Sequence, residues 1–237
     1  MYRKRFLDIE EAKKHDNPEF KPTSLEELNK KIIKNTKTDI DVTNTLGIDC
    51  EMVGTGFKGK KSILARVSIC NLFGKCIYDK FVQPDYGVEV VDYRTEVSGI
   101  RPENLLEKNG ALPFDIVKNE VADLFRNRIL VGHSINSDLK VLKIKHPHWN
   151  IRDTAKYFTK QYGNTPSLKR LVNDFLELGF QTGEHSSVQD AQATMKIYTM
   201  HKKTWEKEIK NAMQKSGKIG GVVVSQKSLR YKKKSSD

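Results

Sequence analysis

The chain has 237 residues, of which 37% are hydrophobic, and a formal net charge of +12. It contains no apolar run near the roughly 18–20 residues of a membrane-spanning helix, and its first residues, MYRKRFLDIEEAKKHD, lack the apolar centre of a signal peptide. Its three cysteines lack C-x-x-C spacing, which argues against a disulfide framework or a zinc site and favours a reducing compartment.

The positive charge is concentrated towards the C-terminus. Residues 201–237 contain 11 Lys and Arg against three Asp and Glu, so the first 200 residues carry a net charge of only +4. A basic segment of this kind favours a polyanionic partner, with nucleic acid ahead of an anionic membrane surface. Composition alone does not distinguish such a role from that of a solubilising, mobile tail.

The first part of the chain divides into a polar extension and a β-rich region. Residues 1–42 are polar and rich in Lys and Glu, and we expect them to lie outside the core, with a short helix over SLEELNKKIIKN. Three β-rich runs follow: TLGIDCEMV (45–53), ILARVSICNLF (63–73) and KCIYDKFVQP (75–84). The short connection near Gly74 favours antiparallel pairing.

Helices and strands then alternate along the chain. Apolar spacing predicts helices over 113–128, 137–145, 165–179 (with Thr165 as N-cap) and from about Val188 to about Asn211, and strands over 129–134 and 149–157. Three leading strands followed by this alternation predict an α/β domain with a mixed sheet. We place that domain at residues 43–204, followed by a basic, mobile C-terminal tail at 205–237.

The stretch LGIDCEMV (46–53) places two carboxylates on a strand that is otherwise apolar. Alternation of side chains puts Asp49 and Glu51 on one face of the strand, roughly 7 Å apart. Like charges that are close and partly removed from water raise each other's pKa. A positive group is therefore expected beside them.

Two further acids stand at positions where they could join this pair. Asp138 follows LVGHSINS, at the step from a strand into a helix, and Asp190 falls in the first turn of the last long helix. Ser186 and Gln189 form a capping box at the start of that helix. Taken singly, each acid has a structural explanation, since an acid in the first turn complements the helix dipole.

Together the four acids suit the metal-dependent hydrolysis of a phosphodiester. Mg²⁺ binds carboxylate, water and phosphate oxygens, and two ions about 3.5–4 Å apart can activate a water and stabilise the leaving oxygen. His185 precedes Asp190 by five positions. Histidine has an ordinary pKa that suits a general base for the attacking water.

Three segments carry a resemblance to a known family. IDCEMVG, VGHSINSDLKVL and HSSVQDAQATMKIY resemble the three exonuclease motifs of the DEDDh superfamily of 3′→5′ exonucleases. ARVSICNLFGKCIYDKFVQP, DYRTEVSGIRPENL, IRDTAKY and PSLKRL are similar to the Rex-type RNA exonucleases, the branch that includes RNA exonuclease four and the interferon-stimulated exonuclease. The resemblance covers about residues 45–200 without a gap.

The resemblance implies a fold, a cofactor and a substrate. The fold would be ribonuclease H-like, a five-stranded mixed sheet with helices on both faces. Two divalent ions, Mg²⁺ or alternatively Mn²⁺, would be held by Asp49, Glu51, Asp138 and Asp190, with His185 as general base. The substrate would be single-stranded RNA, released as nucleoside 5′-monophosphates. This branch is linked to nucleolar processing of pre-ribosomal RNA, and the basic run LRYKKKSSD fits a nuclear, nucleolar location.

Two residues are candidate substrate contacts. Met52 either packs in the core or lies against the terminal base or ribose, because a thioether adapts to flat surfaces. Arg94 in DYRT either donates to the terminal ribose or phosphate or forms a surface ion pair. Asp153 is expected to order the local backbone, and Arg66 could serve either purpose. Gln189 stands where the family usually has Glu, which changes the local charge.

Two alternatives stay open. The same chemistry could act on DNA, because only a contact to the 2′-OH separates the two substrates. The chain could instead be a non-catalytic RNA-binding assembly factor on the same fold, although all five chemical positions are filled. The sequence gives no indication of oligomeric state.

Overall fold

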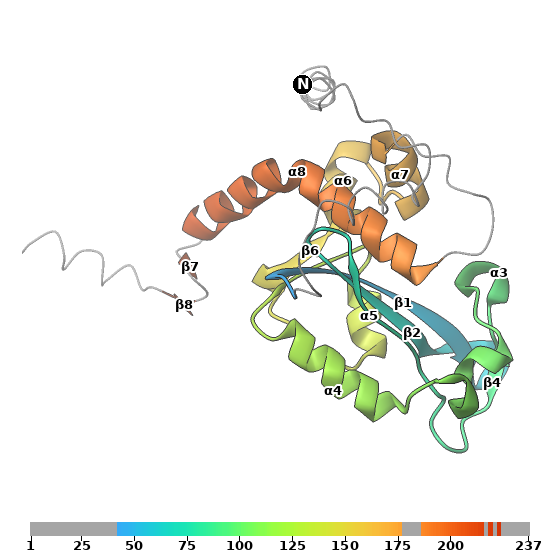
Figure 1. Cartoon of the computed structure of the whole chain (residues 1–237). Coiled ribbons are helices and arrows are strands. Elements are labelled where there is room, and N and C mark those ends of the chain that lie inside the picture. Colours follow the sequence, from blue (N-terminus) through green and yellow to red (C-terminus); the bar gives the residue numbers. More distant parts are fainter. Residues whose placement is uncertain (1–41, 177–185, 216–217, 220–221, 224–237) are drawn as a thin grey trace, which may run out of the picture.

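The computed structural model describes residues 42–176 and 186–215, and after them the backbone of two short strands, β7 (Lys218–Ile219) and β8 (Val222–Val223) (Figure 1). Several sequence predictions lie outside the described residues. These are the N-terminal extension with its short helix, the end of the 165–179 helix, His185 and most of the basic tail.

A mixed sheet forms the centre of the molecule, with strand order β3-β2-β1-β5-β6. Its antiparallel part comprises β1 (Thr45–Thr55), β2 (Lys61–Asn71) and β3 (Cys76–Phe81), and its parallel part adds β5 (Ile129–Gly132) and β6 (Ile151–Asp153) beside β1. The turn after β2 is closed by Asn71, whose Oδ1 accepts from the backbone N–H groups of Phe73 and Lys75, both at 3.0 Å. The predicted antiparallel hairpin at Gly74 is confirmed.

A sixth strand extends the sheet at one end of β1. β4 (Val90–Asp92) pairs antiparallel with residues 54–55 of β1. It is followed by α3 (Thr95–Ser98), η2 (Pro102–Leu105) and η3 (Glu107–Asn109), which lead to the first long helix. The predicted mixed α/β fold with five core strands is thus confirmed, and β4 is an addition to it.

One face of the sheet is covered by α4 (Phe114–Phe125) and α5 (Asn136–Val141) (Figure 1). The apolar side chains of α4 recur every three to four residues, so they form one stripe along the helix. That stripe packs on the even-numbered side chains of β1, in a core that includes Ile48, Cys50, Val121 and Phe125.

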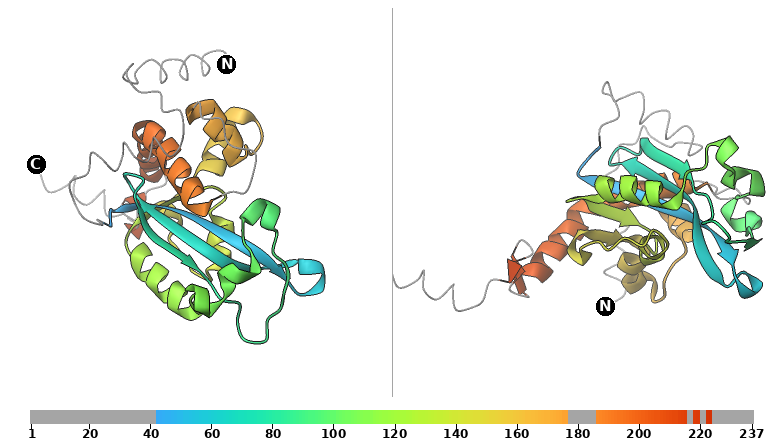
Figure 2. Two further views of the ribbon diagram at one scale, coloured as in Figure 1. Left: turned by 45° about the vertical axis from the view of Figure 1, so that its right-hand side comes forward. Right: turned by 90° about the horizontal axis from the view of Figure 1, so that it is seen from below.

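The opposite face is covered by α6 (Thr154–Tyr162), α7 (Leu168–Leu176) and the 29-residue helix α8 (Ser187–Lys215) (Figures 1 and 2). Ala191, Met195 and Tyr198 of α8 pack with Cys70 of β2. The sheet therefore lies between two helical layers, as the sequence predicts. Of the three cysteines, Cys50 and Cys70 are buried on opposite faces and Cys76 is half-buried.

The predicted domain end at residue 204 falls inside α8. Trp205 is buried and stacks on Tyr157, with 3.8 Å between the ring centroids. One residue further, Glu206 accepts two hydrogen bonds from the guanidinium of buried Arg152, at 2.6 and 2.9 Å. These contacts hold the helix against α6 and β6 beyond residue 204, and its last part extends past the sheet (Figure 2).

Three predicted elements differ from the structure in their bounds. The strand expected over 149–157 is limited to Ile151–Asp153, because Asp153 caps α6 by accepting from the backbone N–H of Ala155 at 3.1 Å. The 137–145 helix ends at Val141, and Lys143 takes a left-handed conformation with φ of 55°. The N-cap of α7 is Ser167 and not Thr165, since its Oγ accepts from the N–H of Arg170.

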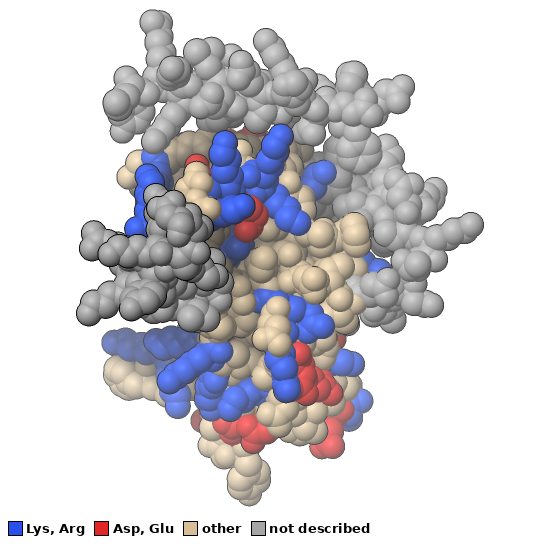
Figure 3. All heavy atoms as spheres, turned by 90° about the vertical axis from the view of Figure 1, so that its left-hand side faces the viewer, with Lys and Arg blue, Asp and Glu red and all other residues tan. Residues whose placement is uncertain are grey.

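Two global properties follow from the described residues. No helix among them combines the length and apolar character needed to cross a membrane. Figure 3 shows one face of the molecule on which Lys and Arg side chains clearly outnumber Asp and Glu, in keeping with the net charge of +12.

Candidate functional site

Strand β1 directs Asp49 and Glu51 towards the face that α8 covers. Gly47 lies on the same face of β1 as Asp49 and Glu51, directly under that helix. A Cβ at this position would come within 2.6 Å of Cys70 Sγ and 3.0 Å of the Ala191 carbonyl oxygen. The glycine thus allows the start of α8 to approach the strand, next to the two carboxylates.

A β-bulge interrupts β1 and β2 directly after Glu51. Glu51 pairs with Arg66 and Met52 pairs with Leu64, so Ala65 is the extra residue on β2. A bulge redirects the side chains that follow it. Glu51 is buried, whereas Met52 is only partly buried and lines a hollow on the other side of the strand.

The second motif brings Asp138 to β1. This residue lies in the first turn of α5, directly beyond β5, and its Oδ1 accepts a hydrogen bond of 3.1 Å from the backbone N–H of Cys50. Cys50 is the residue between Asp49 and Glu51. The carboxylate from α5 is therefore held against the segment that carries the other two.

The third motif brings Asp190 to the same place. α8 begins at Ser187, directly after the predicted capping residue Ser186, and the backbone N–H of Asp190 donates to the Ser186 carbonyl at 2.9 Å. The hydroxyl groups of Ser187 and Ser68 hydrogen-bond, which fixes the first turn of α8 on β2. Asp190 is 9% exposed.

The four acids influence one another's protonation. Burial, followed by the charges of Asp138, Asp190 and Glu51, raises the pKa of Asp49 well above its ordinary value. Burial and the Asp190 charge raise the pKa of Glu51 to about 8. Burial raises the pKa of Asp138 to about 7, although the Cys50 N–H opposes the rise. The acids from three motifs thus form one electrostatic cluster.

Arg66 supplies part of the positive charge expected beside the pair. It stands opposite Glu51 in the strand pairing, and its charge lowers the pKa of both Asp49 and Glu51. Its guanidinium is also held by Asp79 of β3 through two hydrogen bonds, at 2.8 and 2.7 Å. The compensation is therefore incomplete, because the pKa values of Asp49 and Glu51 remain raised.

The donor set of this cluster fits a hard divalent cation. Its ligands would be carboxylate oxygens, which Mg²⁺ and Mn²⁺ prefer, and the raised pKa values mark negative charge that a cation would relieve. Within residues 42–176 and 186–215, no three His, Cys, Asp or Glu side chains are already placed to hold an ion.

The remaining predicted residues differ in their surroundings. His185 lies outside the described residues. The guanidinium of Arg94 donates to the Gly59 carbonyl at 2.8 Å and to Ser62 Oγ at 2.9 Å, so it ties the segment after β4 to the turn after β1. Asp153 orders backbone as predicted, because it accepts from the N–H groups of Ser134 and Ala155. Gln189 is partly buried on the first turn of α8.

The match to a known family covers the whole site. The Exonuclease family (RNase_T) matches residues 46–198, a range that includes all five predicted chemical positions. RNA exonuclease 4 of Xenopus laevis is 53% identical over 183 residues, which cover 76% of this chain and 42% of that protein. RNA exonuclease 4 of Homo sapiens is 53% identical over 168 residues, which cover 70% of this chain and 39% of that protein. This chain thus matches about two-fifths of the length of these relatives.

Solved structures support the same assignment. The pseudoubiquitin hydrolase–RNA exonuclease module of Saccharomyces cerevisiae Pan2, in complex with AAGGAA RNA, superposes with a TM-score of 0.60 at 28% identity and covers 73% of this chain and 32% of that one. The Neurospora crassa Pan2 catalytic unit, at 23% identity, shares the fold with a TM-score of 0.62 over 78% of this chain and 31% of that one. Exonucleases of this kind generally depend on divalent metal ions. With a family match over residues 46–198 and acids from three motifs in one cluster, the chain belongs to the Exonuclease family.

Proposed function

We propose that the chain is a 3′→5′ exoribonuclease that hydrolyses the terminal phosphodiester of single-stranded RNA and releases nucleoside 5′-monophosphates. The observation that carries this proposal is the clustering of Asp49, Glu51, Asp138 and Asp190 within a chain of the Exonuclease family. RNA is favoured as substrate because the relatives are RNA exonucleases and the Pan2 module was solved with RNA.

In this proposal the four carboxylates hold two Mg²⁺ ions, with Mn²⁺ as a substitute. Bound ions would lower the pKa of a coordinated water and neutralise charge on the phosphate. The Cys50 N–H keeps the Asp138 carboxylate oriented towards β1. Arg66 lowers the pKa of Asp49 and Glu51 and so favours the ionised ligands that a metal requires.

His185 is the proposed general base. Its support is its position in the third motif, five residues before Asp190. In this role the imidazole takes the proton of the attacking water and needs to be neutral beforehand. Activity should therefore rise with pH through the titration of this histidine.

We further propose that the RNA is pre-ribosomal and that the chain works in the nucleolus. The support is the similarity to RNA exonuclease 4 and the basic C-terminal segment. Fluorescently tagged full-length chain should accumulate in nucleoli, and its loss should leave 3′-extended ribosomal RNA precursors. A cytosolic distribution together with unchanged precursors would contradict this part of the proposal.

The activity itself is tested with end-labelled substrates. With Mg²⁺ present, 3′-labelled RNA should release its label as a mononucleotide, while 5′-labelled RNA should shorten one nucleotide at a time. The Asp49→Asn variant serves as the matched control and should leave both substrates intact. Internal cleavage, or the absence of hydrolysis with Mg²⁺ and with Mn²⁺, would contradict the assignment. Faster hydrolysis of DNA of the same sequence would show that the substrate is DNA and not RNA.

A further inference from the structure

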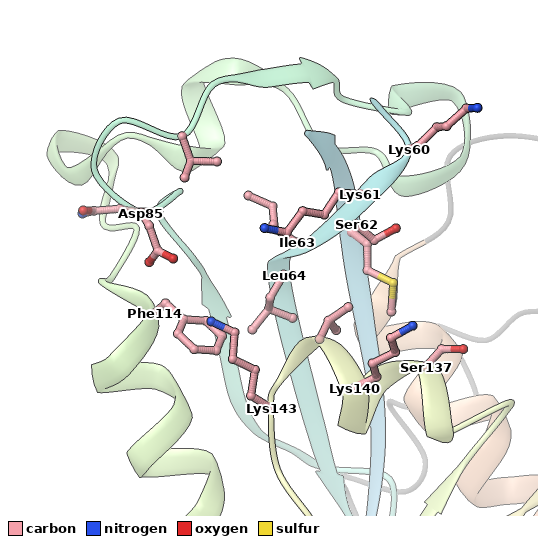
Figure 4. Close-up of a pocket in the computed structure, with 14 residues that line it drawn as sticks. Lys60, Lys61, Ser62, Ile63, Leu64, Asp85, Phe114, Ser137, Lys140 and Lys143 are labelled. Atoms are coloured by element: carbon pink, nitrogen blue, oxygen red, sulfur yellow. The ribbon is translucent and has the colours of Figure 1, made fainter. Parts of the chain in front are cut away.

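A hollow of about 530 Å³ lies between β2, α4 and α5 (Figure 4). Its walls come from β1, β2, the loop before β4, the first turn of α4 and one side of α5. Two lining residues adjoin the cluster directly in the sequence, because Met52 follows Glu51 and Ser137 precedes Asp138. The hollow therefore lies across β1 from Glu51, beside the helix that carries Asp138.

Cationic side chains surround this hollow. Lys61, Lys140 and Lys143 extend their ammonium groups towards it, whereas Lys60 points away (Figure 4). These lysines come from β2, from α5 and from the residues directly after α5, and they are exposed. Asp85 is the acid among the lining residues. The balance of charge around the hollow suits a polyanion.

The inner surface and the rim provide apolar and aromatic surface. Met52 and Phe114 line the hollow as partly buried side chains, and the Lys143 ammonium lies 4.4 Å from the centroid of the Phe114 ring. Two exposed aromatic residues, Phe57 and Tyr86, stand on the loops that border it. Aromatic faces with interspersed lysines match the alternating bases and phosphates of a single strand.

We propose that this hollow, defined by Met52, Lys61, Phe114, Lys140 and Lys143, binds the RNA strand on the 5′ side of the bond that is cut. This inference rests on the proposed function. The terminal nucleotide is joined to the strand through one phosphate, which must lie at the carboxylates to be cleaved. Three cations outside that cluster can therefore meet only phosphates further towards the 5′ end. Bases between these phosphates would lie on Met52 and Phe114.

The test uses the full chain with Lys61→Gln and Lys140→Gln combined. Lys143 is left unchanged, because its ammonium also packs over the Phe114 ring, so its replacement would change more than the charge. Lys80→Gln with Lys160→Gln, two exposed positions on β3 and α6, removes the same charge elsewhere and is the matched control. Thermal melts of both variants establish that they fold.

Binding to a single-stranded RNA of about twelve nucleotides is measured in EDTA, which prevents hydrolysis. The slope of log K against log salt concentration should become less steep by about 1.4 when two phosphate contacts are lost, at about 0.7 per contact. Each contact on a single strand contributes about 0.7 to this slope. The control pair should keep the wild-type slope. An unchanged slope in the Lys61/Lys140 variant, or an equal change in the control, would overturn the proposal.

Kinetics separate this inference from the proposed function. In Mg²⁺ the Lys61/Lys140 variant should have a raised KM for the longer RNA and an unchanged kcat, while its hydrolysis of a dinucleotide should equal that of the wild type. If the variant hydrolyses the dinucleotide less efficiently than the wild type, by the same factor as for the longer RNA, the hollow does not bind the upstream strand. If the wild type binds RNA with the expected slope and hydrolyses nothing, the proposed function fails while the binding assignment stands.

Discussion

Replacing Glu51 with glutamine should change how the stability of the metal-free protein depends on pH. Glu51 has an ordinary pKa of 4.5, which its burial and the Asp190 charge raise to about 8 in the folded state. A carboxyl group with a raised folded-state pKa stabilises the fold fully below pH 4.5, and this contribution is lost as the pH rises towards 8. Glutamine has the shape of the protonated acid and does not titrate.

The size of the effect follows from the two pKa values. At pH 7 the unfolded chain has lost its Glu51 proton, whereas most folded molecules keep it. The interval from 4.5 to 7 is about 2.5 pH units, and each unit corresponds to about 1.4 kcal/mol. The free energy of unfolding of Glu51→Gln, relative to wild type, should therefore increase by about 3 kcal/mol between pH 4.5 and pH 7.

Urea unfolding in EDTA at a series of pH values measures this difference. Glu89→Gln makes the same chemical change at an exposed position and should follow the wild-type curve. Added Mg²⁺ should stabilise the wild type more than Glu51→Gln, because ligand binding to the folded state adds to its stability. If the wild-type and Glu51→Gln curves run parallel from pH 4.5 to 8, Glu51 does not lie in a cluster of acids.

Four further outcomes are expected. Asp49→Asn should abolish mononucleotide release while its melting temperature in EDTA equals or exceeds that of the wild type, because one of several close negative charges is gone. His185→Ala should lower kcat by about 10²–10⁴-fold and remove the rising limb of the pH–rate profile, and an unchanged profile would exclude this histidine as the base. Residues 216–237 contain six Lys and Arg against one Asp. Their removal should make the slope of log K for RNA against log salt less steep by a few units, at about 0.7 per phosphate contact. The kcat at saturating RNA should stay unchanged. Arg152→Ala should lower the free energy of unfolding by about 3 kcal/mol in urea titrations, because it leaves the Glu206 carboxylate without its buried partner.

Local patterns in the sequence were sufficient for the core of the fold. Alternation in LGIDCEMV predicts that Asp49 and Glu51 share a face, and Gly47 on the same face lies against α8 as that face requires. Apolar spacing likewise predicts α4, which buries one stripe, and the sequence also predicts α8, which is buried on every side between Asp190 and Met195. These features depend only on residues within one element, so they can be predicted from the sequence of that element.

Features that depend on distant pairing could not be predicted in this way. The bulge after Glu51 exists because Ala65 of β2 has no counterpart on β1, and strand register is a property of two segments together. β4 is a short strand that joins the sheet only through its pairing with the end of β1. The hollow is assembled from five separate segments, so no single sequence motif predicts it.

The surroundings of the three cysteines, two of them buried and one half-buried, make the protein well suited to site-specific labelling. Burial raises the pKa of Cys50 well above its ordinary value, that of Cys70 to about 12, and that of Cys76 as well. Few of these thiols are thiolates at neutral pH, and thiolate is the form that reacts with maleimides. A cysteine introduced at fully exposed Tyr86 would therefore take up a fluorophore selectively, without removal of the native cysteines. Such a dye, on the loop that borders the hollow, would report RNA arrival in real time.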